Sequence, residues 1–175
     1  MKYGFGIDLG GTTVKIAYFD ETGNMLDKWE IPTVTAGEGK QILPDIAASI
    51  RQFVEGRSIA ETAILGIGIG VPGPVDDHGL VNRCHNLGWG VFNIHKDLGQ
   101  LTGLPVKAGN DANMAALGEA WKGGATGCDN MVLATFGTGV GGGIIIDGKI
   151  YSSFGFWRIF FGRSHGKVFK KFWKR

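Results

Sequence analysis

The sequence predicts an α/β fold in which a mixed sheet carries helices on both of its faces. Three β-type segments at the start of the chain are joined by tight turns, which is typical of an antiparallel meander. Strand-type and helix-type segments then alternate, as in parallel strands with crossover helices. The 31 glycines among 175 residues show no collagen period. They indicate many tight turns, or loops whose backbone approaches a ligand closely.

The meander comes first. Residues 3–10 (YGFGIDLG) alternate apolar residues with glycine and end in a turn, which predicts a buried strand. Residues 14–20 form the second predicted strand and residues 25–33 the third, with the turn ETGN at 21–24 between them. The short connections predict that the three strands pair antiparallel.

Alternating helices and strands follow. Apolar residues recur with helical spacing from Lys40 to Val54, and Pro44 is tolerated there only near the first turn. A β-rich run at 62–71 then ends in the rigid loop PGPVD. The remaining predicted elements are a helix at 93–103, a strand at 104–110, a helix at 111–124, and strands at 130–137 and 142–151.

Composition and charge exclude several classes of protein. Residues 152–175 hold 7 of the 18 basic residues and no acid, so residues 1–151 carry 11 basic residues against all 16 acids. An acidic body of this kind does not predict a nucleic-acid partner. Neither a signal peptide nor a membrane-spanning run is predicted, so we expect a cytoplasmic protein without a membrane partner. Cys84 and Cys128 are expected to be reduced thiols.

Two glycine loops, each between two predicted strands, are candidate phosphate sites. The first, DLGGTT at 8–13, offers Gly10, Gly11, Thr12 and Thr13. The second, FGTGVGGG at 136–143, is not a P-loop, because it lacks GKS or GKT, and not a dinucleotide fingerprint, because a strand rather than a helix follows it. Backbone N–H groups in such turns can converge on phosphate oxygens, although each loop alone is equally consistent with a plain hairpin. Two such loops facing each other could hold a polyphosphate from both sides.

A carboxylate lies between these loops in the sequence. Asp111, in GNDAN at 109–113, is placed where a strand gives way to a helix, so we expect it to be the N-cap. The helix dipole favours a charged carboxylate there, and the reference pKa of about 3.9 keeps it ionised at neutral pH. It could accept a proton from an attacking hydroxyl, which is one of the few things phosphoryl transfer requires of a protein.

Five stretches in order resemble the ROK family of sugar kinases, most closely its bacterial ATP-dependent glucokinases. They are DLGGTT, GIGIGVPGPVD (66–76), HNLGW (85–89), GNDAN and FGTGVGGGI, and together they span residues 4 to about 150. The resemblance implies an actin-like, ribonuclease-H-like ATPase fold with ATP and sugar between two lobes. We expect an N-terminal lobe at 1–135, the phosphate-loop hairpin of a second lobe at 136–151, and an atypical tail at 152–175.

The resemblance also implies roles for individual residues. Asp111 would be the general base that takes the proton from the 6-hydroxyl of glucose or a related hexose. Asn110, Gly73 and, less securely, Asn86 would contact the sugar; Asn86 is at least as consistent with capping the turn before Gly88. The residues implied for the phosphates of ATP are Gly10, Gly11, Thr12, Thr13, Gly137, Thr138 and Gly139, with Asp8 near Mg²⁺ through phosphate or water.

Some polar residues carry no functional prediction. Cys84 and His85 flank Asn86, but two ligands without partners do not make a metal site. Lys15 begins a strand and is expected to be a solvated surface residue. Trp89 and Trp121 are expected to pack rather than to stack on a ligand.

The resemblance stops near residue 151. The family continues with a Gly-Glu-x-Gly-His element and a Cys-x-Cys-Gly zinc loop, and neither occurs in this chain, so we expect no zinc site. Residues 152–175 could be a membrane anchor, a nucleic-acid hook, or an out-of-frame ending, and the abrupt change in composition favours the last. We therefore expect a weakly active or inactive form, and association through an exposed sheet edge to give a homo-oligomer.

Two other functions remain open. The chain could be a kinase of another hexose or of an N-acetylated amino sugar, because the motifs above do not separate these substrates. It could also be a non-catalytic, sugar-sensing member. Family repressors carry a DNA-binding domain ahead of the kinase-like part, and DLGGTT begins here at residue 8. That position and the presence of Asp111 favour the kinase.

Overall fold

The computed structural model describes residues 1–136 and 140–151. The predicted elements all occur; residues 142–151 are divided into two strands by the turn at 147–148, and the other ends lie within two residues of the predicted ones. In chain order the elements are β1 (Tyr3–Leu9), β2 (Thr13–Asp20), β3 (Met25–Pro32), α1 (Ile42–Gly56), β4 (Ile64–Val71), β5 (Leu80–Cys84), β6 (Trp89–Asn93), α2 (Ile94–Thr102), β7 (Val106–Asn110), α3 (Asp111–Lys122), β8 (Met131–Phe136), β9 (Val140–Ile146) and β10 (Lys149–Ile150).

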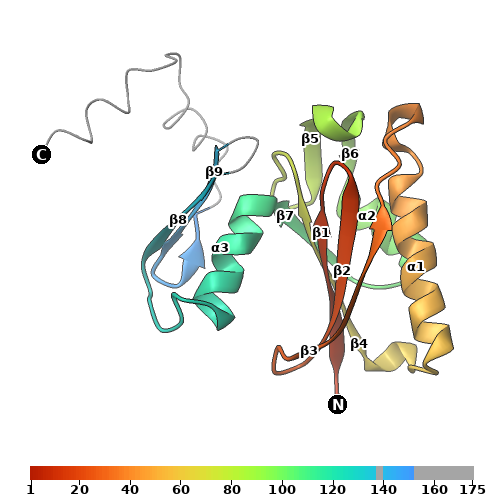
Figure 1. Ribbon diagram of the computed structural model, residues 1–175, viewed down its shortest axis with the longest axis horizontal. Helices are drawn as coiled ribbons and strands as arrows, with labels where there is room; N and C mark the ends of the chain where they lie inside the picture. The colour runs from red at the N-terminus through yellow and green to blue at the C-terminus, as the bar shows by residue number, and fades with distance from the viewer. Residues whose placement is uncertain (137–139, 152–175) are drawn as a thin grey trace, which may run out of the picture.

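The main sheet has five strands in the order β3-β2-β1-β4-β7 (Figure 1). β1, β2 and β3 pair antiparallel, with Phe5 opposite Tyr18 and Ile16 opposite Trp29. β4 pairs parallel with β1, and β7 pairs parallel with β4. The prediction of a mixed sheet, with a meander followed by parallel strands, is confirmed.

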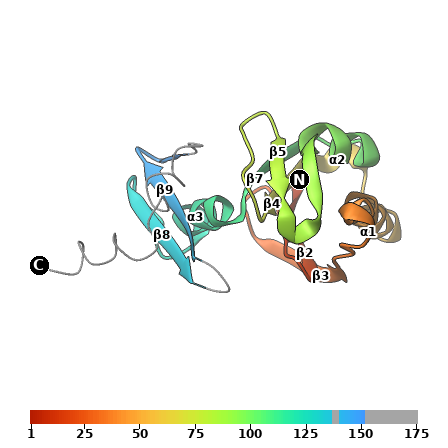
Figure 2. The ribbon, with the colours of Figure 1, turned by 90° about the horizontal axis from the view of Figure 1, so that it is seen from above.

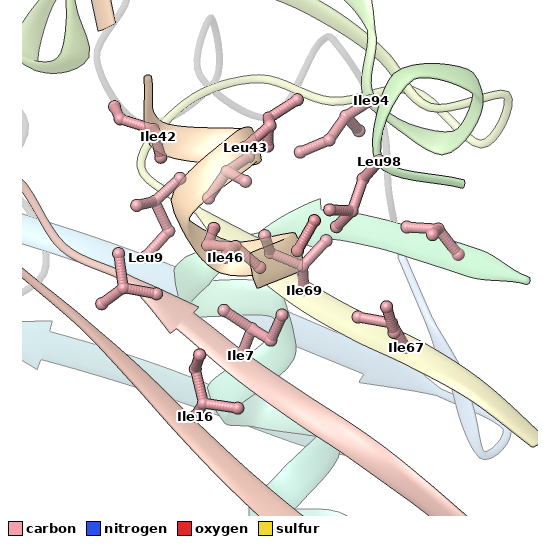
Figure 3. Close-up of a cluster of buried hydrophobic side chains, with 14 of the residues drawn as sticks. Ile7, Leu9, Ile16, Ile42, Leu43, Ile46, Ile67, Ile69, Ile94 and Leu98 are labelled. Atoms are coloured by element: carbon pink, nitrogen blue, oxygen red, sulfur yellow. The ribbon is translucent and has the colours of Figure 1, made fainter. Parts of the chain in front are cut away.

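One face of this sheet carries the hydrophobic core. Side chains alternate along a strand, so Ile7 and Leu9 of β1 and Ile69 of β4 share this face. α1 and α2 cover it, and their apolar residues recur at helical spacing. The close-up of this cluster (Figure 3) labels Ile7, Leu9, Ile16, Ile42, Leu43, Ile46, Ile67, Ile69, Ile94 and Leu98, all of which are buried.

The opposite face is lined largely by glycine and is covered only in part, by α3. Gly70 of β4 and Gly109 of β7 lie against Met114 of α3, and a Cβ on Gly109 would come within 2.4 Å of the Met114 methyl carbon. α3 therefore lies across the sheet from α1 and α2 (Figures 1 and 2). Helices on both faces were predicted and are confirmed.

A hairpin of β5 and β6 was not predicted. It follows β4, and its turn is a short 3-10 segment at His85–Leu87 that ends at Gly88 with a φ of 74°. Each strand has five residues, and β5 exposes Leu80, so the period-two alternation of a longer half-buried strand is weak here. The motif HNLGW thus forms the turn of a hairpin.

β8, β9 and β10 form a separate three-stranded sheet that packs on α3. Gly143 of β9 makes this contact possible, because a Cβ there would come within 2.5 Å of the Ala116 Cβ and 3.0 Å of the Ala112 carbonyl oxygen. α3 is consequently the element that connects the two sheets (Figure 2).

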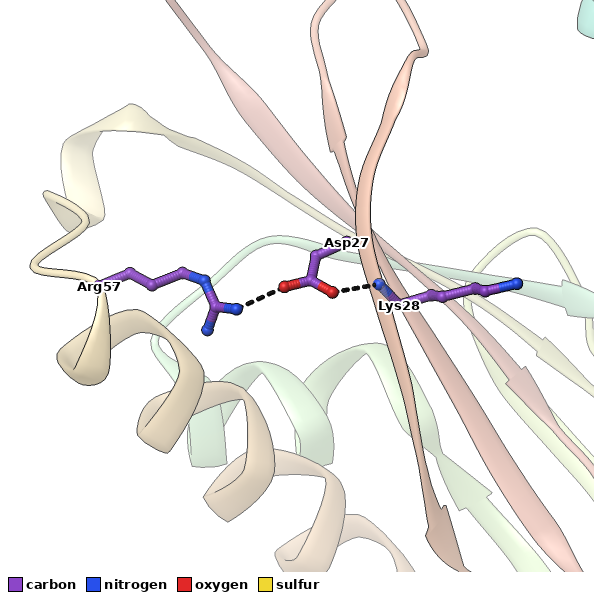
Figure 4. Close-up of polar contacts among 3 residues, drawn as sticks. All are labelled: Asp27, Lys28 and Arg57. Carbon is purple, nitrogen blue, oxygen red and sulfur yellow. Dashed lines mark hydrogen bonds and ion pairs between the residues drawn. The ribbon is translucent and has the colours of Figure 1, made fainter.

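A polar contact fastens the carboxyl end of α1 to the meander. Arg57 pairs with one Asp27 carboxylate oxygen, and the other accepts from the Lys28 backbone N–H at 2.8 Å (Figure 4). The Arg57 guanidinium also lies 3.9 Å from the centre of the Phe53 ring. Such cation–π contacts at exposed sites contribute roughly 0.5–1 kcal/mol.

The described helices are all too short or too polar to span a membrane.

Candidate active site

A cavity of about 860 Å³ opens on the glycine-rich face of the main sheet. β1, β2 and β3 form its floor and the first turns of α3 form one wall. Five charged residues line it: Asp8 of β1, Lys15 of β2, Lys28 and Glu30 of β3, and Asp111 of α3. Because Gly6 and Gly70 bring no side chains to this face, space remains between the sheet and α3.

The first glycine loop forms a tight turn at the end of β1. The Gly10 N–H donates to the Thr13 carbonyl at 3.0 Å, and a Cβ on Gly10 would approach that oxygen to 2.9 Å. Thr33 holds the turn from the next connection, since its hydroxyl donates to the Gly10 carbonyl at 2.8 Å and its N–H to the Thr12 carbonyl at 2.9 Å. Gly11 faces open space. The turn is thus fixed while its tip stays accessible.

The second glycine loop falls only partly within the described residues. Its strands are β8 and β9, which pair antiparallel with Phe136 opposite Val140. The predicted phosphate residues Gly137, Thr138 and Gly139 lie outside the described part of the chain. The hypothesis that the two loops face each other across a nucleotide therefore stays a prediction.

The N-cap of α3 is Asn110, not Asp111 as predicted. The Asn110 side-chain oxygen accepts from the Ala112 N–H at 3.1 Å, and Asn110 has extended backbone geometry. Asp111 is the first helical residue, and one of its carboxylate oxygens accepts from the same N–H at 2.8 Å. This arrangement frees the rest of the Asp111 carboxylate to face the cavity.

The pKa of Asp111 is raised, whereas the helix dipole alone would favour the charged form. Burial by the surrounding protein is the largest cause, and the negative charge of Asp8 adds to it. Hydrogen bonds from the Ala112 N–H and the Asn110 side chain act in the opposite direction. A carboxylate whose pKa lies above its ordinary range holds a transferred proton more readily, which suits a general base.

The predicted sugar residues Gly73 and Asn110 are brought together. The Asn110 Nδ2 donates to the Gly73 carbonyl at 3.2 Å. Gly73 also packs on Cys84, since a Cβ there would lie 3.4 Å from the Cys84 Cβ. Asn86, two residues after Cys84, is exposed in the turn between β5 and β6. Cys84, just before this turn, donates its thiol proton to the Pro72 carbonyl and packs on Gly73, so the turn lies next to the Gly73 loop.

Lys15 is a candidate that sequence reasoning missed. β2 places it opposite Asp8, with the Nζ 3.9 Å from a carboxylate oxygen, and both side chains face the cavity. The one available signal was its position in the strand: with a loop at residues 10–12, residues 8 and 15 become cross-strand partners on one face.

Asp8 and Asp111 also fit a magnesium ion. The described residues hold no group of three or more metal-ligating side chains. Mg²⁺, however, is usually bound through one or two carboxylates together with substrate phosphates and water. Both carboxylates line the cavity, and the charge of Asp8 contributes to the raised pKa of Asp111, which is consistent with such a site.

Comparison with known proteins agrees with this geometry. A glucokinase of Halalkalibacterium halodurans is 44% identical over 146 residues, covering 83% of this chain and 44% of that protein. An N-acetyl-D-glucosamine kinase of Aliivibrio salmonicida is 34% identical over 157 residues, covering 88% of this chain and 49% of that protein. The chain therefore spans less than half the length of these relatives.

A solved structure matches as well. It is a ROK family glucokinase from Streptomyces griseus in complex with glucose and AMPPNP. The two superpose with a TM-score of 0.73 and 36% sequence identity, over 85% of this chain and 46% of that one.

The mixed sheet, the glycine turn after its first strand and the acid that opens α3 define an actin-like ATPase lobe of the sugar-kinase type. The ROK family model matches residues 4–155, and the chain belongs to the ROK family.

Proposed function

We propose that this chain contributes the N-terminal lobe, residues 1–135, of an enzyme that transfers the γ-phosphoryl group of ATP to the 6-hydroxyl of glucose. The observation that carries the proposal is the position of Asp111, at the start of α3 and facing the cavity that Asp8 and Lys15 share. The 44% identity to a glucokinase supports glucose as the sugar.

In this mechanism Asp111 accepts the proton of the 6-hydroxyl as that oxygen attacks the phosphorus. A carboxylate fixed by the Ala112 N–H keeps one oxygen directed at the cavity. Its raised pKa makes it a stronger base than an ordinary aspartate. The charge of Asp8 contributes to this shift and would also repel the ATP phosphates unless a cation neutralises them. Positioning and neutralisation are the main tasks of a protein in phosphoryl transfer.

The phosphates would be held by backbone N–H groups of the turn at Gly10, Gly11, Thr12 and Thr13. Residues 136–151 would be the start of the second lobe, and there Gly137, Thr138 and Gly139 would contact the phosphates from the other side. Lys15 would neutralise phosphate oxygens from the floor of the cavity. Mg²⁺ near Asp8, held through phosphate or water, would supply further charge neutralisation.

The sugar would lie between Asp111 and the loop at Gly73. The amide of Asn110 would bind neighbouring hydroxyls, and the absence of a side chain at Gly73 lets its backbone approach the ring. Asn86 would contact the sugar from the turn between β5 and β6.

We further propose a cytoplasmic protein without a membrane partner. A nucleic-acid partner is not expected either, because residues 1–151 are acidic overall. Association of two or more copies is expected through the sheet of β8, β9 and β10.

The alternative is another sugar of the same class. The similarity to an N-acetyl-D-glucosamine kinase makes an N-acetylated amino sugar the first competitor, followed by fructose or mannose. A non-catalytic sensor would not need a carboxylate directed at the cavity, so it is the weaker hypothesis.

The test has two arms. Residues 1–175 are titrated with glucose, N-acetylglucosamine, fructose and mannose while the amide resonances of the Asn110 and Gly73 region are followed by NMR. In the full-length H. halodurans glucokinase, the residue that aligns with Asp111 is changed to alanine and to asparagine. We expect glucose to shift these resonances most, and both variants to lose about 10⁴-fold in turnover or more.

Two results would refute the proposal. One is a preference for a different sugar in the NMR titration, which would move the assignment to that kinase. The other is near-normal turnover by the asparagine variant, because an amide cannot take the proton.

A further inference from the structure

Cys84 makes polar contacts that packing alone does not require. It ends β5, is 2% exposed, and its thiol donates to the Pro72 carbonyl oxygen at 2.7 Å. The backbone N–H groups of Asn86 and Leu87 act on the same thiol and partly lower its pKa. Burial raises the pKa of the thiol, so it keeps the proton that this donation needs. The sulfur therefore joins the turn between β5 and β6 to the loop at residues 72–73.

The loop at 72–73 in turn holds Asn110. Gly73 packs on Cys84, with a Cβ at residue 73 lying 3.6 Å from the sulfur, so little freedom remains between them. The carbonyl of Gly73 accepts from the Asn110 Nδ2 at 3.2 Å. Of the two consecutive carbonyls in this loop, that of Pro72 thus accepts from the cysteine and that of Gly73 from the asparagine amide.

Asn110 connects this loop to the acid. Its side-chain oxygen caps α3 at the Ala112 N–H, the same donor from which the Asp111 carboxylate accepts. An amide group is planar, so an Nδ2 held by the Gly73 carbonyl fixes the orientation of the Oδ1 as well. Both the cap of α3 and the direction of the acid then depend on where the Gly73 carbonyl lies.

We propose that Cys84 is a positioning residue for Asp111: its thiol holds the 72–73 loop in place, the loop holds the Asn110 amide, and that amide orients the carboxylate. The functional meaning of this chain of contacts rests on the proposed role of Asp111 as the base. Asn110 and Gly73 are also the proposed sugar contacts, so displacement of the loop weakens glucose binding at the same time.

If Cys84 served only as an apolar packing residue, a valine at this position should leave the 72–73 loop in place. The pocket that holds the side chain would accept valine, which is apolar and branched but cannot donate. Serine keeps a donor of similar reach and loses apolar character. Comparing the two separates packing from hydrogen bonding, because valine tests the missing donor and serine tests its restoration.

The experiment uses residues 1–175 with Cys84→Val, Cys84→Ala and Cys84→Ser, and with Cys128→Ala as a control at the exposed cysteine. Two NMR signals are read at neutral pH without any ligand: the side-chain amide of Asn110 and the carboxyl carbon of Asp111. An Asp111→Asn variant assigns the carboxyl resonance. We expect both signals to move in the valine and alanine variants and to return near their original positions in the serine variant.

Glucose affinity gives a second reading. It is expected to fall by about tenfold in the valine variant, which corresponds to one misplaced hydrogen bond, and to recover in the serine variant. Cys128→Ala is expected to leave the NMR signals and the affinity unchanged.

A valine variant that folds and keeps both NMR signals of the parent overturns the proposal. So does a serine variant that shows the same changes as valine. If alanine prevents folding, the valine and serine variants still decide. Because the NMR signals need neither sugar nor nucleotide, a failure of the kinase proposal in the turnover assay remains distinguishable from a failure of this one.

Discussion

Asp111 experiences two opposing influences on its charge. Its place in the first turn of α3 favours the carboxylate, as do the hydrogen bonds from Ala112 and Asn110. Burial and the charge of Asp8 disfavour the carboxylate, and they are stronger, so the pKa is raised. The folded state therefore pays a cost for keeping this acid ionised near neutral pH, as is common for residues selected for activity.

The first prediction is that Asp111→Asn stabilises the chain at neutral pH. Between the unfolded pKa of about 3.9 and the higher folded value, the folded state binds more protons, so the unfolding free energy falls as pH rises. Asparagine removes this penalty. Melting temperatures measured from about pH 3 to about pH 8 should show the variant above the parent at high pH, with the difference vanishing at low pH.

Glu55→Gln, at an exposed site on α1, controls for net charge. A variant less stable than the parent at neutral pH would contradict the argument.

The second prediction is that Lys15→Gln affects binding far more than stability. Lys15 and Asp8 have side chains 68% and 64% exposed, and such pairs contribute at most about 1 kcal/mol. The unfolding free energy of Lys15→Gln, measured by urea denaturation, is thus expected to differ from that of the parent by less than about 0.5 kcal/mol.

Affinity for ATP with Mg²⁺, measured by calorimetry, is expected to fall by about fivefold to tenfold. Lys107→Gln on β7 supplies a matched control, since Lys107 is exposed but does not line the cavity. An equal loss of affinity in both variants would assign the effect to overall charge rather than to the site.

Individual site residues differed in how far the sequence could locate them. The glycine turn at Gly10 and the acid at Asp111 were predictable because local patterns and motif resemblance both mark them. Lys15 and Cys84 were not, because their significance depends on what lies across the strand or in the adjacent loop. Such neighbours are set by sheet register and hairpin docking, which single-residue patterns do not contain.

Among the elements, α3 has the most connected position. It begins with the acid, lies against β4 and β7 through Met114, and carries the second sheet on Ala112 and Ala116. The small residues on both sides of this last contact allow β9 to approach the helix backbone closely. A change at the α3–β9 contact should therefore affect the second sheet before it affects the main core.

The third prediction concerns that contact. Gly143→Ala places a Cβ 2.5 Å from the Ala116 Cβ, a distance that forces β9 away from α3. We expect a loss of about 1–3 kcal/mol, the usual cost of overpacking. Amide hydrogen exchange should lose protection in β8 and β9 while β1 and β4 keep theirs.

The matched control for Gly143→Ala lies on α3 itself. A Cβ on Gly118 would meet nothing within 4 Å, so Gly118→Ala should stabilise the helix by about 0.5–1 kcal/mol. If Gly143→Ala and Gly118→Ala change the unfolding free energy in the same direction, then α3 and β9 are not packed as described.

The elements of the fold were predictable where their pattern was long. The apolar spacing of α1 and the alternation of β1 and β2 each extend over enough residues to give a clear period. The hairpin of β5 and β6 was missed because its strands are short and its core contribution is concentrated in Val81, Cys84, Leu87 and Trp89. No period can be read from so few buried positions.

At the scale of the whole molecule, the two faces of the main sheet serve different purposes. One is filled by branched apolar side chains and by α1 and α2, which fixes the fold. The other carries glycines along β1 and β4 and leaves the cavity open. The abundance of glycine in the sequence predicted close backbone approach, but only the strand pairing shows that Gly4, Gly6, Gly68 and Gly70 gather on one face of adjacent strands.

The last prediction concerns association of the whole chain. Among the described residues β8 pairs only with β9, so it forms one edge of the second sheet, and it exposes 70% of Val132 and 75% of Phe136. A strand with apolar exposed residues at an edge tends to pair with another copy. Sedimentation velocity over a range of concentrations should therefore show self-association. Val132→Lys should reduce it without lowering the melting temperature, because a charge on an edge strand opposes pairing.

Val91→Lys separates this edge from general surface hydrophobicity. Val91 is 59% exposed on β6, so its replacement makes the same change in charge and a similar change in exposed apolar area at a site outside the second sheet. Association that responds equally to both variants would arise from the overall charge of the chain. Association that responds to Val132→Lys alone would place the contact at β8, and the exposed Phe136 on the same strand would then be expected to enter the interface with it.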